Sequence, residues 1–149
     1  DLVGRKTARD GGAFARSIAA MVEATEAQLL TRDSAAARAV QKRLTAARLA
    51  FVDVVDFIAA NARSNPNATY AGSVPYLMLA GNLIAGWQLA RSLLVAEDKL
   101  AAGEDAAFMS AKIATARFYA EHILSRAGGT RDAIVEGADS VTALALDAF

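Results

Sequence analysis

Two carboxylates in an apolar run are the side chains of this chain whose spacing could support acid–base chemistry. Asp53 and Asp56 lie three residues apart within Phe51–Phe57, so a helix places them on one face. Two such carboxylates can act as a general acid and a general base. On the outer face of an otherwise apolar helix, however, carboxylates more often face water or pair with arginine. We expect Arg91 or Arg117 to supply that partner from another helix.

Other catalytic and metal-binding patterns are missing from the sequence. There is no cysteine and the single histidine is His122, so neither a thiol nucleophile nor a serine hydrolase triad can be assembled in the usual way. Adjacent helical residues such as Glu121 and His122 point about 100° apart and cannot share one ion. The paired Glu-x-x-His motifs of a di-iron bundle are also absent. The sequence predicts no catalytic residue and no metal site, and His122 is expected to be partly exposed near a helix end.

The composition favours helices and disfavours several kinds of partner. Hydrophobic residues make up 54% of the 149 residues, and there are only two prolines. This balance favours helices, because the abundant alanine loses no side-chain entropy in them. Sixteen basic residues balance sixteen acidic ones, so the chain lacks the net positive charge typical of nucleic-acid-binding proteins, and we predict no nucleic-acid partner. The absence of cysteine suits a reducing compartment, and we expect a cytoplasmic location.

The most apolar stretch, Val74–Leu94, approaches the length of a membrane span. It contains Asn82, Gln88 and Arg91, and an arginine within a membrane helix is costly. We therefore predict no membrane span. A bundle that lies on a membrane surface is an alternative favoured by the hydrophobicity, but the neutral charge and the lack of a basic helix face oppose it.

Apolar residues recur every three or four positions in four long segments, which is the pattern of helices with one buried face. In the first segment the repeat passes from Phe14 through Met21 to Leu29, and in the second it continues from Val40 to Ile58. The expected helices extend from Asp10 or the glycines after it to Leu30, from Asp33 or Ser34 through Ile58, from a cap at Ser73 to about Ala102, and from Phe108 or Met109 to Gly128-Gly129.

Proline, glycine and polar residues indicate where these helices end. Pro66 disfavours helical geometry at the residue before it, so Asn61–Thr69 is expected to be a loop. Gly103 is expected to stop the third helix. Asp139 or Ser140 is expected to cap a short fifth helix in the tail.

The short connections predict one all-α domain. Long helices joined by short loops pack most simply as an antiparallel, up-down-up-down four-helix bundle, here with a short C-terminal helix. Residues 10–149 are expected to form this bundle, because no linker is long enough to divide two domains. Asp1–Arg9 is polar, charged and outside the first periodic segment, so we interpret it as a strap from an upstream region.

Two glycines in the third helix predict a tight contact between helices. Gly81 and Gly86 would each weaken a helix by roughly 0.5 to 1 kcal/mol relative to alanine, and a close approach by a neighbouring backbone would account for both. The aromatic residues nearby have the helical spacing of core or interface residues rather than that of a ligand cage; they are Tyr76, Trp87, Phe118 and Tyr119.

These features give the chain a family resemblance. With the opening Asp1-Leu2-Val3-Gly4-Arg5-Lys6, the aromatic and small residues of Gly72–Arg91 and Lys112–Leu124 resemble the helical C-terminal region of FAD-dependent acyl-CoA dehydrogenases. The resemblance covers nearly the whole chain. Its motif residues, which we interpret as packing residues, are Tyr76, Gly81, Gly86, Trp87, Arg91, Arg117, Phe118 and Tyr119.

The resemblance implies a parent flavoprotein that oxidises acyl-CoA to 2-enoyl-CoA, with FAD and acyl-CoA bound by upstream catalytic domains of the same polypeptide. In that family a catalytic glutamate lies just before a segment like Asp1–Lys6, and no residue of this chain matches that stretch. The implied role is non-catalytic packing or assembly of a homo-oligomer, and the isolated chain is expected to bind no cofactor and to be inactive. Arg5 and Lys6 are the candidates for contact with FAD or acyl-CoA near the upstream junction.

A different class of function stays open at this point. A freestanding helical interaction module could dimerise through the face that carries Gly81, Gly86 and Trp87. Such a module predicts no flavin in the native assembly.

Overall fold

The computed structural model describes residues 1–148, and helices provide all of their regular secondary structure. The six α-helices are α1 (Ala13–Leu30), α2 (Ala35–Asn61), α3 (Pro66–Ala71), α4 (Ser73–Ala101), α5 (Ala106–His122) and α6 (Ala127–Val135). Shorter helical turns of the 3-10 or π type cover Leu2–Thr7, Ala8–Asp10, Leu124–Arg126, Ala138–Thr142 and Leu146–Ala148. No residue in 1–148 belongs to a strand, which confirms the all-α class.

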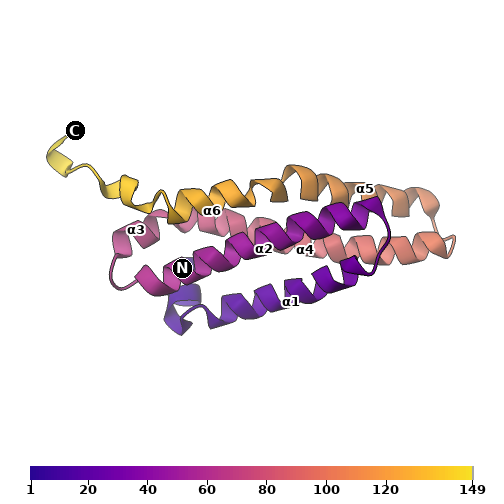
Figure 1. Cartoon of the computed structure of the whole chain (residues 1–149), viewed down its shortest axis with the longest axis horizontal. Helices are drawn as coiled ribbons and strands as arrows, with labels where there is room; N and C mark the ends of the chain where they lie inside the picture. Colours follow the sequence, from indigo (N-terminus) through magenta and orange to yellow (C-terminus); the bar gives the residue numbers. More distant parts are fainter. Residues whose placement is uncertain (149) are drawn as a thin grey trace.

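The four longest helices lie along the long axis of the molecule (Figure 1). Ion pairs show that α1 and α2 run in opposite directions. Arg16, near the start of α1, binds Asp56 near the end of α2, whereas Glu26, near the end of α1, binds Arg48 earlier in α2. The last residues extend away from the helices at the end of the molecule where α3 lies (Figure 1).

Contacts of α4 with α2 and with α5 also join residues that lie toward opposite ends of the two helices. Ser34, at the start of α2, hydrogen-bonds Glu97 near the end of α4. The ring of Phe51 stacks on Tyr76 near the start of α4, with 5.8 Å between the ring centroids. Near the end of α5, the hydroxyl of Tyr119 lies 3.4 Å from the carbonyl oxygen of Asn82 in the first half of α4.

Side chains accept hydrogen bonds from amides at the starts of α1, α2, α3 and α5. The hydroxyl of Ser34 accepts a hydrogen bond of 2.9 Å from the amide of Ala37, and the carboxylate of Asp105 accepts one of 3.3 Å from the amide of Phe108. At the start of α1 the Asp10 carboxylate accepts from two backbone amides, each at 3.0 Å. These bonds satisfy amides that have no partner within their own helix. Ser73 does not cap α4 as predicted, because its hydroxyl donates back to a carbonyl of the preceding turn instead.

The segment predicted as a loop between the second and third helices is partly helical. The prediction was wrong because Pro66 occupies the first position of α3, where its missing amide proton costs nothing. The side chain of Asn65 caps this short helix by accepting from the amide of Ala68 at 3.3 Å.

The predicted end of the fourth helix was also wrong. Helix α5 ends at His122, and a 3-10 turn leads into α6, which contains Gly128 and Gly129 in its first turn. Glycine tolerates helical as well as non-helical geometry, so this pair marks a helix start here. The predicted fifth helix is replaced by the 3-10 turns Ala138–Thr142 and Leu146–Ala148.

The first residues are folded onto the helices. Leu2–Thr7 forms a π-helical turn in which Val3 and Thr7 are buried. The segment was predicted to be polar and outside the core. Val3 and Thr7 were missed because the residues between them include two charged ones, which hide the helical spacing of four.

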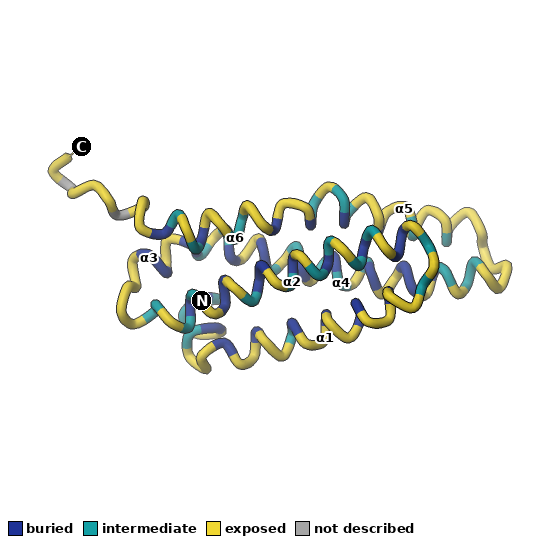
Figure 2. Tube along the Cα trace, in the orientation of Figure 1, coloured by how far each residue is buried: buried dark blue, intermediate teal, exposed yellow. Residues whose placement is uncertain are grey.

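The repeat predicted for the first helix matches its buried face only in its second half, at Thr25 and Leu29. Phe14 and Met21 are exposed, and the buried positions are Ala15, Ala19, Val22, Thr25, Glu26 and Leu29. Figure 2 shows the buried positions of the long helices facing one another and the exposed ones facing outward. Helix α1 therefore has apolar residues on its outer surface as well as on its inner one.

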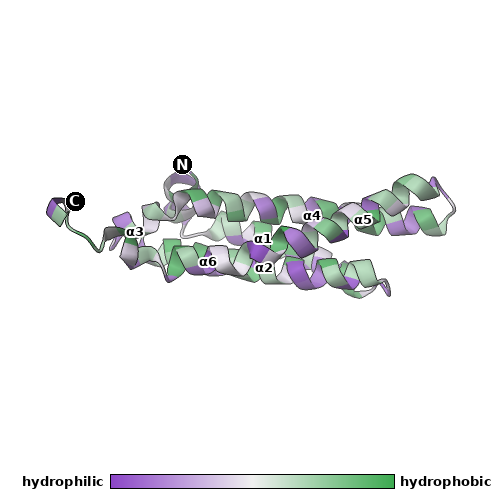
Figure 3. Cartoon of the chain, turned by 90° about the horizontal axis from the view of Figure 1, so that it is seen from above, coloured by the Kyte–Doolittle hydropathy of each residue, from purple (hydrophilic) through white to green (hydrophobic). Residues whose placement is uncertain are grey.

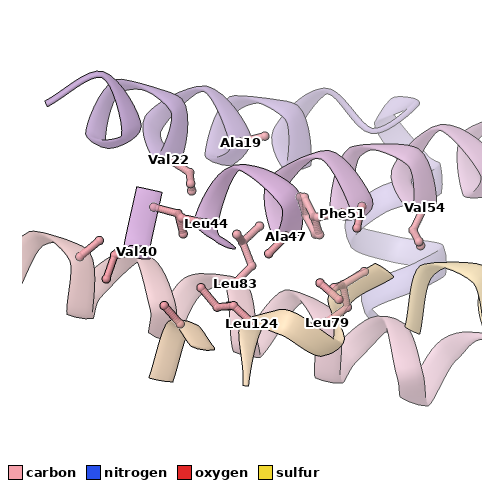
Figure 4. Close-up of a cluster of buried hydrophobic side chains, with 14 of the residues drawn as sticks. Ala19, Val22, Val40, Leu44, Ala47, Phe51, Val54, Leu79, Leu83 and Leu124 are labelled. Atoms are coloured by element: carbon pink, nitrogen blue, oxygen red, sulfur yellow. The ribbon is translucent and has the colours of Figure 1, made fainter. Parts of the chain in front are cut away.

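Helix α2 lies at the centre of the core. It contacts α1, α4, α5 and α6, and its residues Leu44, Ala47, Val54 and Val55 are fully buried. Figure 4 shows Leu44 between Val22 of α1 and Leu83 of α4. The continuous stripe predicted from Val40 to Ile58 is thus the inner surface of this helix.

Candidate functional site

The two carboxylates that could have formed an acid–base pair each bind an arginine. The Asp53 carboxylate accepts from Arg131 of α6 at 3.2 Å, and the Asp56 carboxylate accepts from Arg16 of α1 at 2.5 Å. Both carboxylates are more than half exposed. Such exposed pairs contribute little to stability. They link α6 and α1 to α2. Nothing in this geometry distinguishes a proton donor from an acceptor.

The predicted arginine partners were wrong. Arg91 donates to the side chain of Gln88 at 2.9 Å and lies over the ring of Trp87, 5.7 Å from its centroid. Arg117 pairs with Glu121 one turn further along α5. Both arginines are exposed, so each is held by its own helix rather than by a carboxylate of α2.

His122 does not belong to a cluster of metal ligands. Its ring packs against that of Phe118 in a tilted arrangement, with 4.5 Å between centroids, and both residues are exposed near the end of α5. Within residues 1–148 no group of three histidine or acidic residues could hold a metal ion.

Tyr76 joins the N-terminal turn to α4 and α2. Its hydroxyl lies 2.9 Å from the hydroxyl of Thr7, and its ring stacks on Phe51. Both residues are buried, so each hydroxyl provides the other with the hydrogen-bond partner that water would otherwise supply. Burial raises the pKa of Tyr76, and the hydrogen bond from Thr7 opposes this effect only in part.

This shift predicts a loss of stability at alkaline pH. Because the pKa of Tyr76 is higher in the folded state, its contribution is complete below the unfolded pKa of about 10 and is lost as pH rises through the folded value. In urea titrations from pH 8 to pH 11, we expect Tyr76→Phe to flatten the alkaline decline of the free energy of unfolding. At pH 7 the same variant should lose about 1 to 3 kcal/mol, because the Thr7 hydroxyl is left without a partner. Identical pH profiles for the two proteins would contradict the assignment.

Trp87 connects α4 to α1, and Tyr119 connects α5 to α4. The indole N–H of Trp87 donates to the hydroxyl of Thr25 in α1 at 2.8 Å. Tyr119 is half-buried against α4, where its hydroxyl lies 3.4 Å from the carbonyl of Asn82, and burial raises its pKa. Phe118, the neighbouring aromatic residue, points away from the core and is exposed.

The two glycines of α4 have different surroundings. A Cβ atom at Gly86 would lie 2.7 Å from Cδ1 of Leu124, a leucine that is itself buried. A Cβ atom at Gly81 would meet nothing within 4 Å, and Gly81 is exposed. A close contact is therefore present at Gly86, but with a side chain rather than with the neighbouring backbone that was predicted, and the prediction is wrong for Gly81.

Substitution by alanine should separate these two glycines. Gly81→Ala should stabilise the fold by about 0.5 to 1 kcal/mol, because alanine has less freedom to lose on folding and meets no neighbour. Gly86→Ala should destabilise it, because displacement of Leu124 costs about 1 to 3 kcal/mol and exceeds the same helical gain. Urea unfolding of both variants checks this; a shift of the same sign in both would contradict the packing described.

Comparison with known proteins identifies the family of this chain. Residues 14–145 match the family model described as "Acetyl-CoA dehydrogenase C-terminal like". The chain belongs to this family. It is thus the C-terminal domain of an acyl-CoA dehydrogenase.

Two curated relatives of this acyl-CoA dehydrogenase domain show how much lies outside it. The chain is 47% identical over 146 residues to a 3-methylmercaptopropionyl-CoA dehydrogenase of Ruegeria pomeroyi, a match to 98% of this chain and 25% of that protein. It is 41% identical over 66 residues to the broad-specificity linear acyl-CoA dehydrogenase FadE5 of Mycobacterium tuberculosis, covering 42% of this chain and 11% of that protein. The chain therefore spans about a quarter of the first relative's length.

Arg5 and Lys6 lie on the surface of the acyl-CoA dehydrogenase domain. Both are exposed, and the guanidinium of Arg5 pairs with Asp1. Together with Arg9 and Phe14 they line a shallow groove of about 410 Å³. The groove is thus lined by three cations and one carboxylate, that of Asp10. The single aromatic side chain among the lining residues does not provide an enclosure for a flavin ring.

Sequence reasoning missed a buried ion pair between α1 and α2. The carboxylate of Glu26 accepts from Arg48 at 2.8 and 3.0 Å and from the hydroxyl of Thr45 at 2.8 Å. The Glu26 and Arg48 side chains are only 6% and 13% exposed. A signal was available, because Glu26 is four residues from Val22 and three from Leu29 and so lies within the buried stripe.

Across residues 1–148 no helix combines the length and the apolar character that a bilayer crossing requires. The face proposed for dimerisation of a freestanding module is largely occupied within the chain, because Leu124 covers Gly86 and Thr25 binds Trp87.

Proposed function

We propose that this C-terminal domain has no catalytic group of its own and serves packing within an FAD-dependent acyl-CoA dehydrogenase. The parent enzyme would oxidise acyl-CoA to 2-enoyl-CoA in upstream catalytic domains of the same polypeptide. The observation that carries this proposal is the state of the candidate carboxylates: Asp53 and Asp56 are bound to arginines and join helices. Their geometry supports a structural role.

We further propose that α1, α2, α4 and α5 form the body of this domain as an up-down-up-down four-helix bundle. The opposed ion pairs of α1 and α2, together with the contacts of Ser34 and Tyr119 with α4, support this topology. A rigid bundle suits assembly, because it presents surfaces of fixed shape to a neighbouring domain or to a second subunit in a homo-oligomer.

Arg5 and Lys6 are proposed to approach FAD or acyl-CoA only through phosphate groups. Their exposed cationic side chains support such a contact. FAD supplies the hydride acceptor when bound to the parent, and no step of that chemistry is assigned to a residue of this domain. The isolated chain is expected to bind no flavin.

The test is the size, colour and activity of the native polypeptide that carries this sequence. Purification with an antibody against the chain should give a much larger yellow protein that contains flavin and reduces a dye when supplied with acyl-CoA. The isolated domain should melt cooperatively, remain colourless and show no activity. A colourless native polypeptide no longer than this chain would overturn the proposal in favour of a freestanding interaction module.

A further inference from the structure

Helix α1 carries apolar side chains on the surface that does not face the core. Phe14 is 61% exposed and Met21 is 49% exposed, and Ile18 between them is half-buried. These three residues have helical spacings of four and three, and so share one face. The core of the bundle uses different residues of α1, among them Val22 and Leu29.

Helix α4 has an exposed apolar face in its first half. From Ser73 to Ala90 the sequence contains no charged residue, and this stretch lies beside the N-terminus in Figure 3. Val74 is 71% exposed and Leu77, Met78 and Ile84 are also exposed. Their spacing places them on one side of the helix, opposite the buried residues Leu79 and Leu83.

The apolar faces of α1 and α4 are continuous. One groove, of about 210 Å³, is lined by Phe14 and Ile18 of α1, Ala80 and Ile84 of α4, and Leu2. A second groove, of about 500 Å³, is lined by Leu2 again and by Val74 and Leu77. We call this continuous surface, consisting of Leu2, Phe14, Ile18, Val74, Leu77 and Ile84, the α1–α4 face.

We infer that the α1–α4 face is covered by the part of the parent polypeptide that precedes Asp1. This inference rests on the proposed function and specifies which surface performs the packing. A large contiguous apolar patch on a protein surface is typical of an interface. The absence of charge from Ser73 to Ala90 fits a largely apolar partner, and the charged residues that line the two grooves, Asp1 and Lys6, belong to the N-terminal segment.

The position of the first residue identifies the occupant. Asp1 itself lines the groove formed by Leu2, Val74 and Leu77, so residues joined to Asp1 leave the domain at the α1–α4 face. In the Ruegeria relative about three quarters of the chain lies outside the matched region. A C-terminal domain has that remainder on its N-terminal side, and covalent attachment through Asp1 gives the preceding region a high effective concentration at this face.

Photo-crosslinking in the full-length parent polypeptide tests the inference. A benzophenone amino acid is introduced at Leu77 in one protein and at Leu49, an equally exposed leucine of α2, in a control. A third variant carries it at Val74, in case the first is destabilised. Isotopically light and heavy copies are mixed before irradiation, so that mass spectrometry separates crosslinks within one copy from those between two.

The inference predicts that position 77 or 74 crosslinks to peptides preceding Asp1 within one copy, and that position 49 does not. Crosslinks between light and heavy copies would overturn it in favour of a homo-oligomer contact. No crosslink at 77 and 74, or equal crosslinking from 49, would also overturn it. The flavin content of the same sample tests the proposed function separately: a yellow protein without the predicted crosslinks contradicts the inference alone, whereas a colourless protein contradicts the proposed function.

Discussion

Leu44→Ala is expected to lower the free energy of unfolding by about 2 to 5 kcal/mol. Leu44 is fully buried in α2, between Val22 of α1 and Leu83 of α4 (Figure 4). Removal of its three outer carbons loses their transfer free energy and leaves a cavity that three packed helices cannot close. Urea unfolding monitored by circular dichroism measures the change.

Leu49 provides the matched control for this substitution. It lies five residues further along the same helix and is 52% exposed. Leu49→Ala removes the same atoms, but the expected change is within about 0.5 kcal/mol, because an exposed site leaves no cavity. Equal losses in the two variants would mean that α2 is not central to the core.

Glu26→Ala is expected to have the second large effect, a loss of about 3 kcal/mol. The substitution leaves the guanidinium of Arg48 buried without its bidentate partner, and breaking one half of a buried pair typically costs about 3 to 5 kcal/mol. Glu23 lies 3.3 Å from the same guanidinium and should limit the loss to the lower end of that range. In the intact protein the hydrogen bond with Glu26 raises the pKa of Arg48. An arginine side chain does not deprotonate in a protein even without such a partner, so the buried guanidinium of the variant stays charged.

Two further variants define the origin of this loss. Glu23→Ala removes an exposed carboxylate from the same arginine and should cost less than about 1 kcal/mol. The double variant Glu26→Leu with Arg48→Met should recover most of the stability, because an apolar pair requires no charge compensation. A double variant as unstable as Glu26→Ala would show that the site depends on packing shape rather than on unpaired charge.

The parts of the fold that were predictable are those in which local signals agree. The end of α1 at Leu30 and the stripe of α2 from Val40 to Ile58 follow from periodicity, and Gly103 stops α4 in a left-handed conformation with φ of 77°. At each position hydrophobic spacing and terminal residues indicate the same boundary.

The missed features depend on information from outside the local segment. Phe14 and Met21 have core-like spacing, but the inner face of α1 is formed by other residues, Ala15, Ala19 and Val22 among them. Periodicity alone cannot choose between two apolar faces of one helix. Helix α3 and the turn between α5 and α6 were missed because proline and glycine can start a helix as well as end one.

The candidate site was less predictable than the fold. The spacing of Asp53 and Asp56 correctly places them on the outer surface of α2, but their partners, Arg131 and Arg16, lie 78 and 40 residues away in the sequence. Long-range pairing of exposed charges has no local signal. Glu26 differs in this respect. A charge within an apolar stripe requires compensation when it is buried, so the sequence indicates that Glu26 has a partner, although not which residue it is.

The bond between Thr7 and Tyr76 determines where this domain can be cut and joined in a gene fusion. The family match begins at residue 14, and α1 begins at Ala13, so a boundary there looks natural. A chain started at Ala13 would nevertheless lose Val3 and Thr7 from the interior and leave the buried hydroxyl of Tyr76 without a partner. The smallest transplantable unit therefore includes the N-terminal helical turn, and recombination between relatives should preserve the segment from Leu2 to Gly12 together with α4.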